Sequence, residues 1–189
     1  MELEEYKKLY NITEDQIKKN MLRPGENAYR TSLKELIGQK YIARNRVFKR
    51  FIEDDLHYEY LGYKKVTDKR KQKAGADYEV FYNDDGVEKK LYVDLKSLQG
   101  PHYEQIPLEL EQNGIWTNGK NKITDYHLYI VHDDGEPRHK WIPYDTIVKE
   151  CAKYRPQIEH NGNVCFFKWA DEVYTSNNGS GKYIKWSTI

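Results

Sequence analysis

The sequence predicts an α/β fold in a single domain, and two observations predict it. Apolar residues recur at helical spacing before residue 58, whereas alternating apolar and polar residues after residue 76 form short segments separated by turn residues. The chain has 189 residues, enough for one domain with a sizeable core and too few for two typical domains. We therefore expect one domain over residues 1–189, in which residues 1–31 form an N-terminal helical appendage.

The N-terminal half predicts helices. Thr13 and Gln16 have the spacing of a capping box and predict the start of a short helix, and Pro24-Gly25 follows its end. The expected helices run from about Thr13 to Met21, from about Ser32, and most clearly from Asn45 to Tyr58 as one long amphipathic helix. Gly62 is expected to end this helix before the first strand.

The rest of the chain predicts strands and one further helix. The expected strands are Tyr63–Val66, Asp77–Tyr82, Glu88–Lys96, Ile106–Glu111, Tyr126–His132, His139–Ile142, Val164–Trp169 and Tyr183–Trp186. The expected helix runs from Tyr144 to Tyr154.

Composition excludes several classes of protein. Charged residues make up 32% of the chain, and 17 Tyr predict a tyrosine-rich core. The net charge of +1 gives no global field for a polyanion, so only a local patch can attract one. Apolar stretches such as 128–131 are too short to span a membrane, and the acidic first residues do not form a secretory signal. We expect a cytoplasmic protein without a membrane partner.

Cysteine and histidine carry no chemistry that the sequence reveals. Cys151 and Cys165 lack the spacing of a zinc site, and we interpret both as ordinary buried thiols. The six histidines have no metal-ligand spacing, and none lies beside a plausible nucleophile in the sequence.

The turn after residue 82 predicts a β-hairpin. If Asp85-Gly86 is the two-residue loop, Asp77 lies directly opposite Asp94. If Asp84-Asp85 is the loop instead, the two aspartates are diagonal neighbours. Both registers place them on one polar face, which also carries Glu79, Lys90, Tyr92 and Lys96.

Two carboxylates across an antiparallel ladder repel each other and need a cation. Lys96, two residues beyond Asp94 on the same face, is one candidate, and a divalent metal with oxygen ligands is another. A metal beside a lysine supports hydrolysis of a phosphodiester, because the metal lowers the pKa of water and neutralises phosphoryl charge. The residues themselves therefore indicate a nuclease.

Asp77, a sixteen-residue spacer and Asp94-Leu95-Lys96 after an apolar segment resemble the signature of the PD-(D/E)xK, or restriction-endonuclease-like, nucleases. Over roughly Phe48 to Tyr144 the chain is similar to uncharacterised phage-type members, through Asp68 to Asp77, Leu108 to Glu111 and Thr124-Asp125-Tyr126. The resemblance implies a mixed β-sheet flanked by helices, dependence on Mg²⁺ or Mn²⁺, and DNA as the substrate. It also implies the cytoplasm of a bacterial or phage-infected cell.

By the family pattern, Asp77 and Asp94 would bind the metal and Lys96 would assist the attacking water. Glu53 on the preceding helix matches the additional acid of many members, although Asp54 and Asp55 compete for this role. The chain departs from the pattern at Ala76, where the family has proline, and over Gln99–Gln112, where the family often has a helix and this sequence predicts a loop and strand.

Glu109 and Glu111 share one face of the segment that follows. They would suit a further metal ligand if that strand neighbours the hairpin, and a solvated strand face is an equal alternative.

The densest basic run is Lys64–Lys73. We expect it to contact DNA phosphates without reading the base sequence, and a solvated loop is the alternative. The residues that we assign to nucleic-acid binding are Lys69, Arg70, Lys71, Gln72 and Lys73.

Together these features predict a metal-dependent endonuclease that hydrolyses DNA. The alternatives are a non-catalytic module that binds nucleic acid or a host protein on the same fold, and a nuclease that acts on RNA. A homodimer would be compatible with cleavage of both DNA strands, but the sequence does not indicate a dimer surface.

Overall fold

The structure is a computed structural model that describes residues 3–21, 24–99, 123–132 and 137–146. It also describes the backbone of three two-stranded sheets, β4–β9, β5–β6 and β10–β11. Their strands are β4 (Gln105–Leu108), β5 (Glu111–Gln112), β6 (Ile115–Trp116), β9 (Cys165–Lys168), β10 (Tyr174–Thr175) and β11 (Lys182–Tyr183). Across the described residues, no helix combines the length and apolar character needed to cross a membrane.

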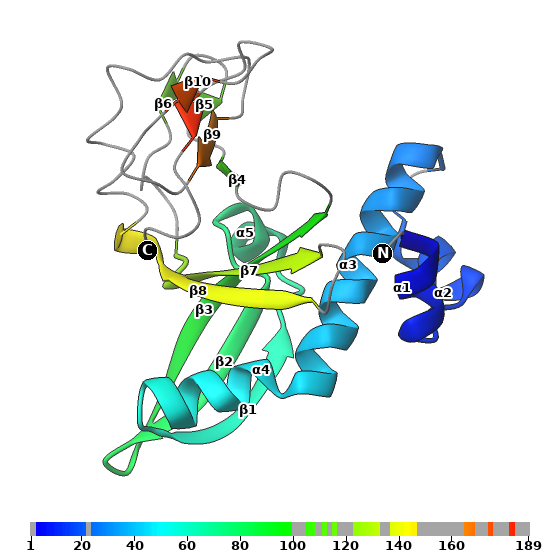
Figure 1. Cartoon of the computed structure of the whole chain (residues 1–189). Helices are drawn as coiled ribbons and strands as arrows, with labels where there is room; N and C mark the ends of the chain where they lie inside the picture. Colours follow the sequence, from blue (N-terminus) through cyan, green and yellow to red (C-terminus); the bar gives the residue numbers. More distant parts are fainter. Residues whose placement is uncertain are drawn as a thin grey trace.

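A mixed five-stranded sheet forms the centre of the fold (Figure 1). Its strands are β1 (Glu59–Lys65), β2 (Tyr78–Asp84), β3 (Val87–Gln99), β7 (Tyr126–His132) and β8 (Arg138–Pro143), in the order β1-β2-β3-β7-β8. The β3–β7 pair is parallel, and the other neighbours are antiparallel. Helices pack against this sheet, so the predicted α/β class is confirmed.

The hydrophobic core lies between one face of the sheet and the helix α3 (Glu26–Asn45) with the short helices that follow it. The sheet supplies Tyr78, Val80, Leu91, Val93, Leu128 and Ile130, all buried. The helices supply Leu33, Ile37, Ile42, Val47, Phe48, Phe51 and Ile52. The core face of the hairpin is therefore the face opposite the predicted polar one.

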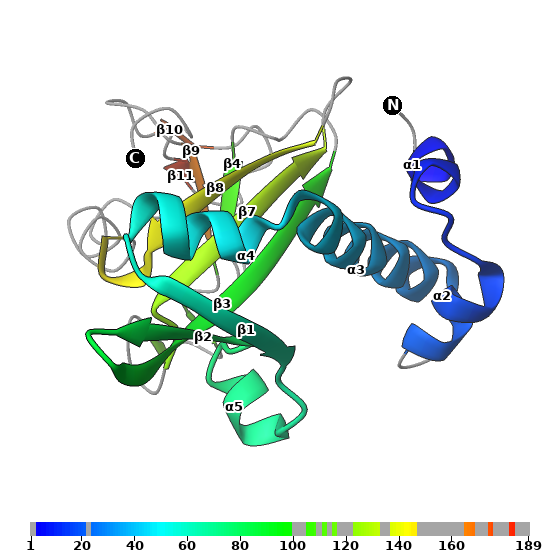
Figure 2. The ribbon, with the colours of Figure 1, turned by 90° about the horizontal axis from the view of Figure 1, so that it is seen from below.

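The predicted helix over Asn45–Tyr58 is confirmed in part, because the chain is helical from Val47 to Asp55. It is separated from α3 by a break at Arg46. Arg46 adopts the left-handed conformation with φ 50°, and its amide hydrogen-bonds to carbonyls of the last turn of α3. The helix α4 (Val47–Arg50) and a single π-helical turn, η1 (Phe51–Asp55), then follow in a new direction (Figure 2). No Gly or Pro marks this break, and the apolar spacing continues across it.

The first strand begins earlier than predicted. β1 starts at Glu59 rather than at Tyr63, and Gly62 lies inside it instead of ending a helix. Gly62 has φ 143°, and the register of β1 on β2 shifts between Tyr60 and Gly62. A backbone of this kind suits glycine, which lacks the Cβ that restricts other residues.

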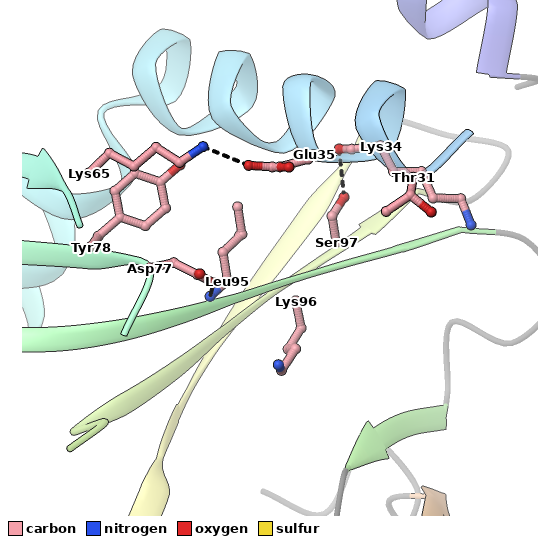
Figure 3. A pocket seen from close by; sticks show the side chains of 9 residues that line it. All are labelled: Thr31, Lys34, Glu35, Lys65, Asp77, Tyr78, Leu95, Lys96 and Ser97. Carbon is pink, nitrogen blue, oxygen red and sulfur yellow. Dashed lines mark hydrogen bonds and ion pairs between the residues drawn. The ribbon is translucent and has the colours of Figure 1, made fainter. Parts of the chain in front are cut away.

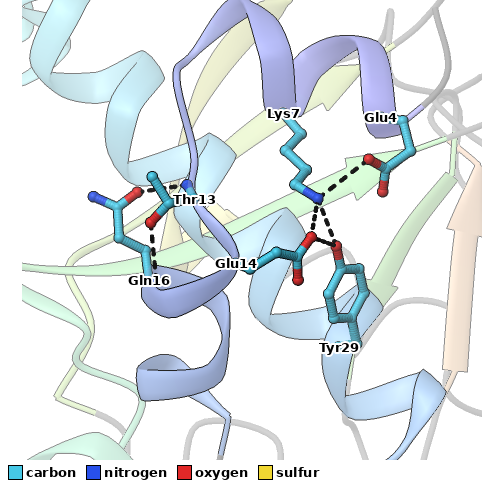
Figure 4. Close-up of polar contacts among 6 residues, drawn as sticks. All are labelled: Glu4, Lys7, Thr13, Glu14, Gln16 and Tyr29. Carbon is cyan, nitrogen blue, oxygen red and sulfur yellow. Dashed lines mark hydrogen bonds and ion pairs between the residues drawn. The ribbon is translucent and has the colours of Figure 1, made fainter.

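The N-terminal helices α1 (Leu3–Leu9) and α2 (Glu14–Asn20) lie against α3, beyond the sheet (Figure 2). The predicted capping box is confirmed, since Thr13 and Gln16 bond reciprocally through side chain and backbone. Tyr6 and Ile17 are fully buried and belong to the core cluster. A polar cluster of Glu4, Lys7, Glu14 and Tyr29 joins these helices to α3 (Figure 4).

The hairpin adopts the first of the two predicted registers. Asp85 and Gly86 have φ 51° and 85°, which is the backbone of a two-residue type I′ turn. The ladder runs from Asp84 opposite Val87 to Tyr78 opposite Val93. β3 extends to Gln99, three residues beyond the predicted end.

The later strands follow the predictions in part. β7 has the predicted bounds, and β8 is one residue longer at each end. The predicted strand Ile106–Glu111 is divided between β4 and β5, which pair with β9 and β6 and not with the hairpin. Short strands β9 and β11 overlap the last two predicted strands. The predicted helix from Tyr144 is helical at residues 144–146 and otherwise lies outside the described residues.

Candidate active site

The segment that leads into Asp77 is fixed on both sides. The short helix α5 (Lys69–Lys73) begins at Asp68, whose carboxylate accepts a hydrogen bond from the amide of Arg70. After α5 the chain turns through Gly75, which has φ 86°. The hydroxyl of Thr124 donates to the carbonyl of Gly75 at 2.5 Å. The loop before Asp77 is therefore tied to the start of β7.

Asp77 makes hydrogen bonds next to three strands, since it precedes β2 and contacts the residue after β1 and residues within β3. Its amide donates to the carbonyl of Val93 at 2.9 Å, and its carbonyl accepts from the amide of Val66 at 2.8 Å. Its carboxylate oxygen Oδ2 accepts from the amide of Leu95 at 2.9 Å. The ladder of the hairpin ends at the pair Tyr78–Val93, and Asp77 follows it with its amide bonded to Val93, the residue before Asp94.

The two aspartates interact electrostatically. The pKa of Asp77 is raised from 3.8 to about 6, first by burial and second by the negative charge of Asp94. The amide of Leu95 and the charge of Lys96 act in the opposite direction. Asp94 is only 6% exposed. The sequence prediction of two close carboxylates at this position agrees with this geometry.

Lys96 is the cation of this pair. Its Nζ lies 2.8 Å from Oδ1 of Asp94, and about a third of the side chain (34%) remains exposed. Figure 3 shows Lys96 on the opposite side of β3 from Leu95 and Ser97, which point toward α3. The structure therefore brings Asp77, Asp94 and Lys96 together.

Two buried residues of β7 complete the cluster, and sequence reasoning missed both. The parallel register pairs His127 with Asp94, and Nε2 of His127 lies 3.5 Å from Oδ2 of Asp94. The other ring nitrogen, Nδ1, lies 2.9 Å from the hydroxyl of Tyr129. His127 is 4% exposed and Tyr129 is fully buried. The alternating pattern of β7 places His127 and Tyr129 on one face of that strand. This pattern points to the aspartates only when the pairing of β7 with β3 is known.

A cleft of about 480 Å³ opens beside Asp77 (Figure 3). Its lining residues are Thr31, Lys34 and Glu35 of α3, Lys65 of β1, Asp77, Tyr78, and Leu95, Lys96 and Ser97 of β3. Glu35 accepts a hydrogen bond from Lys65 at 2.7 Å, and burial lowers the pKa of Lys34. Lys65 belongs to the predicted basic run, whereas sequence reasoning did not select Glu35, because only the packing of α3 on the sheet brings it to this cleft.

Glu53 lies elsewhere. It is exposed in η1 and pairs with Lys49, whose Nζ is 3.7 Å from its carboxylate. The residue of the sheet that Glu53 influences is Tyr60. Burial raises the pKa of Tyr60, and the charges of Tyr63 and Glu53 raise it further. Tyr60 pairs with Tyr82, five residues along the chain from Asp77, a separation of about 17 Å in a strand. The structure thus does not bring Glu53 to the aspartates.

The further acids of the prediction are not described as side chains. Glu109 lies outside the described residues, and Glu111 is described only as backbone in β5, which pairs with β6. In the described part of the chain, no three His, Cys, Asp or Glu side chains form a group that would hold a metal ion.

The basic run divides into residues of two kinds. Lys71 and Gln72 make contacts within the fold, since Lys71 pairs with Glu79 at 2.7 Å and Gln72 donates to the carbonyl of Val66 at 2.8 Å. Lys69, Arg70 and Lys73 are exposed on α5.

Comparison of the sequence with models of protein families and with curated proteins gave no match.

Proposed function

We propose that this chain is a metal-dependent endonuclease that hydrolyses DNA phosphodiester bonds, with Asp77 and Asp94 as metal ligands and Lys96 beside them. One observation carries the proposal. Two carboxylates lie close together beside the hairpin, where burial and then the charge of Asp94 raise the pKa of Asp77, and where Lys96 contacts Asp94.

The topology supports a restriction-endonuclease-like fold for this proposal. A helix precedes three antiparallel strands, β1, β2 and β3, and β7 then joins β3 in parallel. This is a mixed sheet flanked by helices, as the resemblance of the Asp77 and Asp94-Leu95-Lys96 motif implies.

The donor set suits a hard divalent cation. Mg²⁺ prefers oxygen ligands, and it is usually bound by one or two carboxylates, with water and substrate phosphate at its other positions. Asp77 and Asp94 supply two carboxylates whose mutual repulsion such a cation would relieve. A group of three protein ligands is not needed for this kind of site.

The residues of the chain have distinct tasks in the proposed hydrolysis. The bound metal ion would lower the pKa of a water molecule and neutralise charge on the phosphoryl group. Lys96, with its ammonium at 2.8 Å from Asp94, orients that water and adds positive charge next to the phosphate. The amide of Leu95 and the imidazole of His127 hold Asp77 and Asp94 in place. Water adds across the phosphorus–oxygen bond and leaves a phosphomonoester and a free hydroxyl.

A binding module without chemistry explains the site less well. Raising the pKa of a buried carboxyl to about 6 destabilises the ionised protein at neutral pH. A surface that only docks nucleic acid gains nothing from two carboxylates that repel both each other and the phosphates.

The test is cleavage of supercoiled, linear and branched DNA with Mg²⁺ or Mn²⁺ by the purified protein. Asp94→Ala and Lys96→Ala are each expected to lower the rate by about 100-fold or more, because the first removes a proposed metal ligand and the second a positive charge next to the reacting phosphate. The matched controls are Asp84→Ala and Lys89→Ala, an acid and a lysine of the same hairpin that pair with each other. Absence of cleavage by the parent, or variants that cut as fast as the parent, would contradict the proposal.

A further inference from the structure

Three lysines from three different elements converge on one buried carboxylate. Lys64 of β1, Lys71 of α5 and Lys90 of β3 place their Nζ atoms 2.8, 2.7 and 3.6 Å from the carboxylate of Glu79. Glu79 is 1% exposed. We call Lys64, Lys71 and Lys90 the lysine cluster. The sequence pattern predicts Lys90 on the same hairpin face as Glu79, but only the structure brings Lys64 and Lys71 to this carboxylate.

The lysine cluster carries a net positive charge. Hydrogen bonds from Lys64 and Lys71 lower the pKa of Glu79 to about 2, and the bond to Glu79 raises the pKa of Lys71. The carboxylate of Glu79 is therefore charged at neutral pH, and three lysines face this one anion. The lysine side chains are 63%, 38% and 42% exposed. Since an ammonium has three donors, each lysine keeps donors for a ligand in solvent.

Aromatic rings support the lysine stems. Lys64 lies over the ring of Phe81, with Nζ 5.2 Å from the centroid. Lys71 and Lys90 both lie over the ring of Tyr92, at 5.5 and 5.1 Å. Such contacts restrict the flexible side chains, so less conformational entropy is lost when a ligand binds.

The lysine cluster stands next to the aspartate pair on the same face of the hairpin. Glu79 follows Asp77 by two residues on one strand, and its partner Tyr92 precedes Asp94 by two on the other. Two residues of a strand span about 7 Å. This distance is of the order of the separation between neighbouring phosphates of one nucleic-acid strand.

We propose that the lysine cluster is a binding subsite for the backbone phosphates of DNA that flank the phosphate held at Asp77 and Asp94. This inference rests on the proposed function and adds the direction of the substrate, which runs from the aspartate pair along the hairpin toward its turn. Glu79 acts as a positioning residue, because it holds three cations of separate elements at one place. The subsite takes Lys64 and Lys71 from the predicted basic run Lys64–Lys73 and Lys90 from β3.

The test is equilibrium binding of a short fluorescein-labelled DNA duplex, measured by anisotropy over a range of salt concentrations in EDTA. Each of Lys64→Gln, Lys71→Gln and Lys90→Gln is expected to weaken binding and to reduce the slope of log K against log salt by about 0.9, the value for one lost phosphate contact. Lys89→Gln is the matched control, since Lys89 is an exposed lysine next to Lys90 that points to the other face and pairs with Asp84. Its slope is expected to equal that of the parent.

A second variant guards against misfolding. The quadruple variant Lys64→Gln, Lys71→Gln, Lys90→Gln and Glu79→Gln leaves no buried charge unpaired, and it is expected to reduce the slope by about 2.7. Unchanged slopes in the single and quadruple variants, or an equal loss in Lys89→Gln, would overturn the lysine cluster as a phosphate subsite. A parent that cleaves DNA while these slopes stay unchanged would overturn this inference alone. A parent that binds with the expected slopes and cleaves no DNA would overturn the proposed function alone.

Discussion

Nε2 of His127 lies 3.5 Å from Oδ2 of Asp94, and both side chains are buried where β3 and β7 run in parallel. The opposite nitrogen of the imidazole contacts the hydroxyl of Tyr129 at 2.9 Å. The ring therefore lies between Tyr129 and Asp94, and we expect it to help orient the Asp94 carboxylate. Lys96 holds the other oxygen of Asp94 at 2.8 Å.

His127→Ala is expected to raise the Mg²⁺ concentration at half-maximal cleavage by about 10- to 100-fold, as loss of a residue that orients a metal ligand does. His127→Gln should recover part of this loss, because its amide can still donate to Asp94. The measurement is a Mg²⁺ titration of cleavage. His139→Gln is the control, since His139 is another histidine that contacts a tyrosine, Tyr41, at 2.7 Å. An unchanged Mg²⁺ requirement in His127→Ala would show that His127 does not orient Asp94.

Asp77→Asn is expected to change the pH dependence of stability. The pKa of Asp77 in the fold is about 6, above its ordinary 3.8. The folded protein therefore binds more protons than the unfolded chain between these values, and this group's contribution to stability falls as the pH rises from about 4 to about 6. Above that range a constant penalty on the order of 1 to 3 kcal/mol remains. Asparagine removes the penalty, and its carbonyl can still accept from Leu95.

The measurement for Asp77→Asn is urea unfolding in EDTA at pH 4.5 and pH 7.5. The variant should be more stable than the parent at pH 7.5, and the difference should shrink at pH 4.5. Asp84→Asn, on the same strand, is the control. A difference between variant and parent that is the same at both pH values would contradict the raised pKa of Asp77.

Mn²⁺ is expected to stabilise the parent and to have little effect on Asp77→Asn. A ligand that binds only the folded state stabilises it by about 2.7 kcal/mol at 100 times its dissociation constant. The comparison is urea unfolding at pH 7.5 with and without Mn²⁺. Equal stabilisation of parent and variant would place the metal elsewhere, or in the unfolded chain.

The sequence predicts those parts of the site that depend on short-range pairing. The turn at Asp85-Gly86 sets the register of the hairpin, whose ladder ends at the pair Tyr78–Val93. Asp77 and Asp94 directly follow these two residues, and they interact there. His127 could not be assigned in this way, because its place beside Asp94 depends on a parallel pairing between strands that are distant in the sequence. Glu53 was selected because it lies on the helix before the strands, but the packing of that helix leaves it exposed and paired with Lys49.

Substitutions of Gly38 test how α3 supports β3, the strand that carries Asp94 and Lys96. A Cβ at this position would lie 3.3 Å from Cδ2 of Leu95 and 3.5 Å from Cβ of Ser97, so α3 packs closely on β3 here. Gly38→Ala adds one methyl group against a movable leucine and gains up to about 1 kcal/mol of helix propensity, so it should be close to neutral. Gly38→Leu should overpack this contact and cost about 1 to 3 kcal/mol.

Because Leu95 lies between Asp94 and Lys96, overpacking at Gly38 should also displace the aspartate pair. Cleavage by Gly38→Leu is therefore expected to fall further than the fraction of unfolded protein explains, whereas Gly38→Ala should cut like the parent. Urea unfolding and the cleavage rate at saturating Mg²⁺ separate the two effects. If leucine at position 38 leaves both quantities unchanged, α3 does not hold β3 in the position that the site requires.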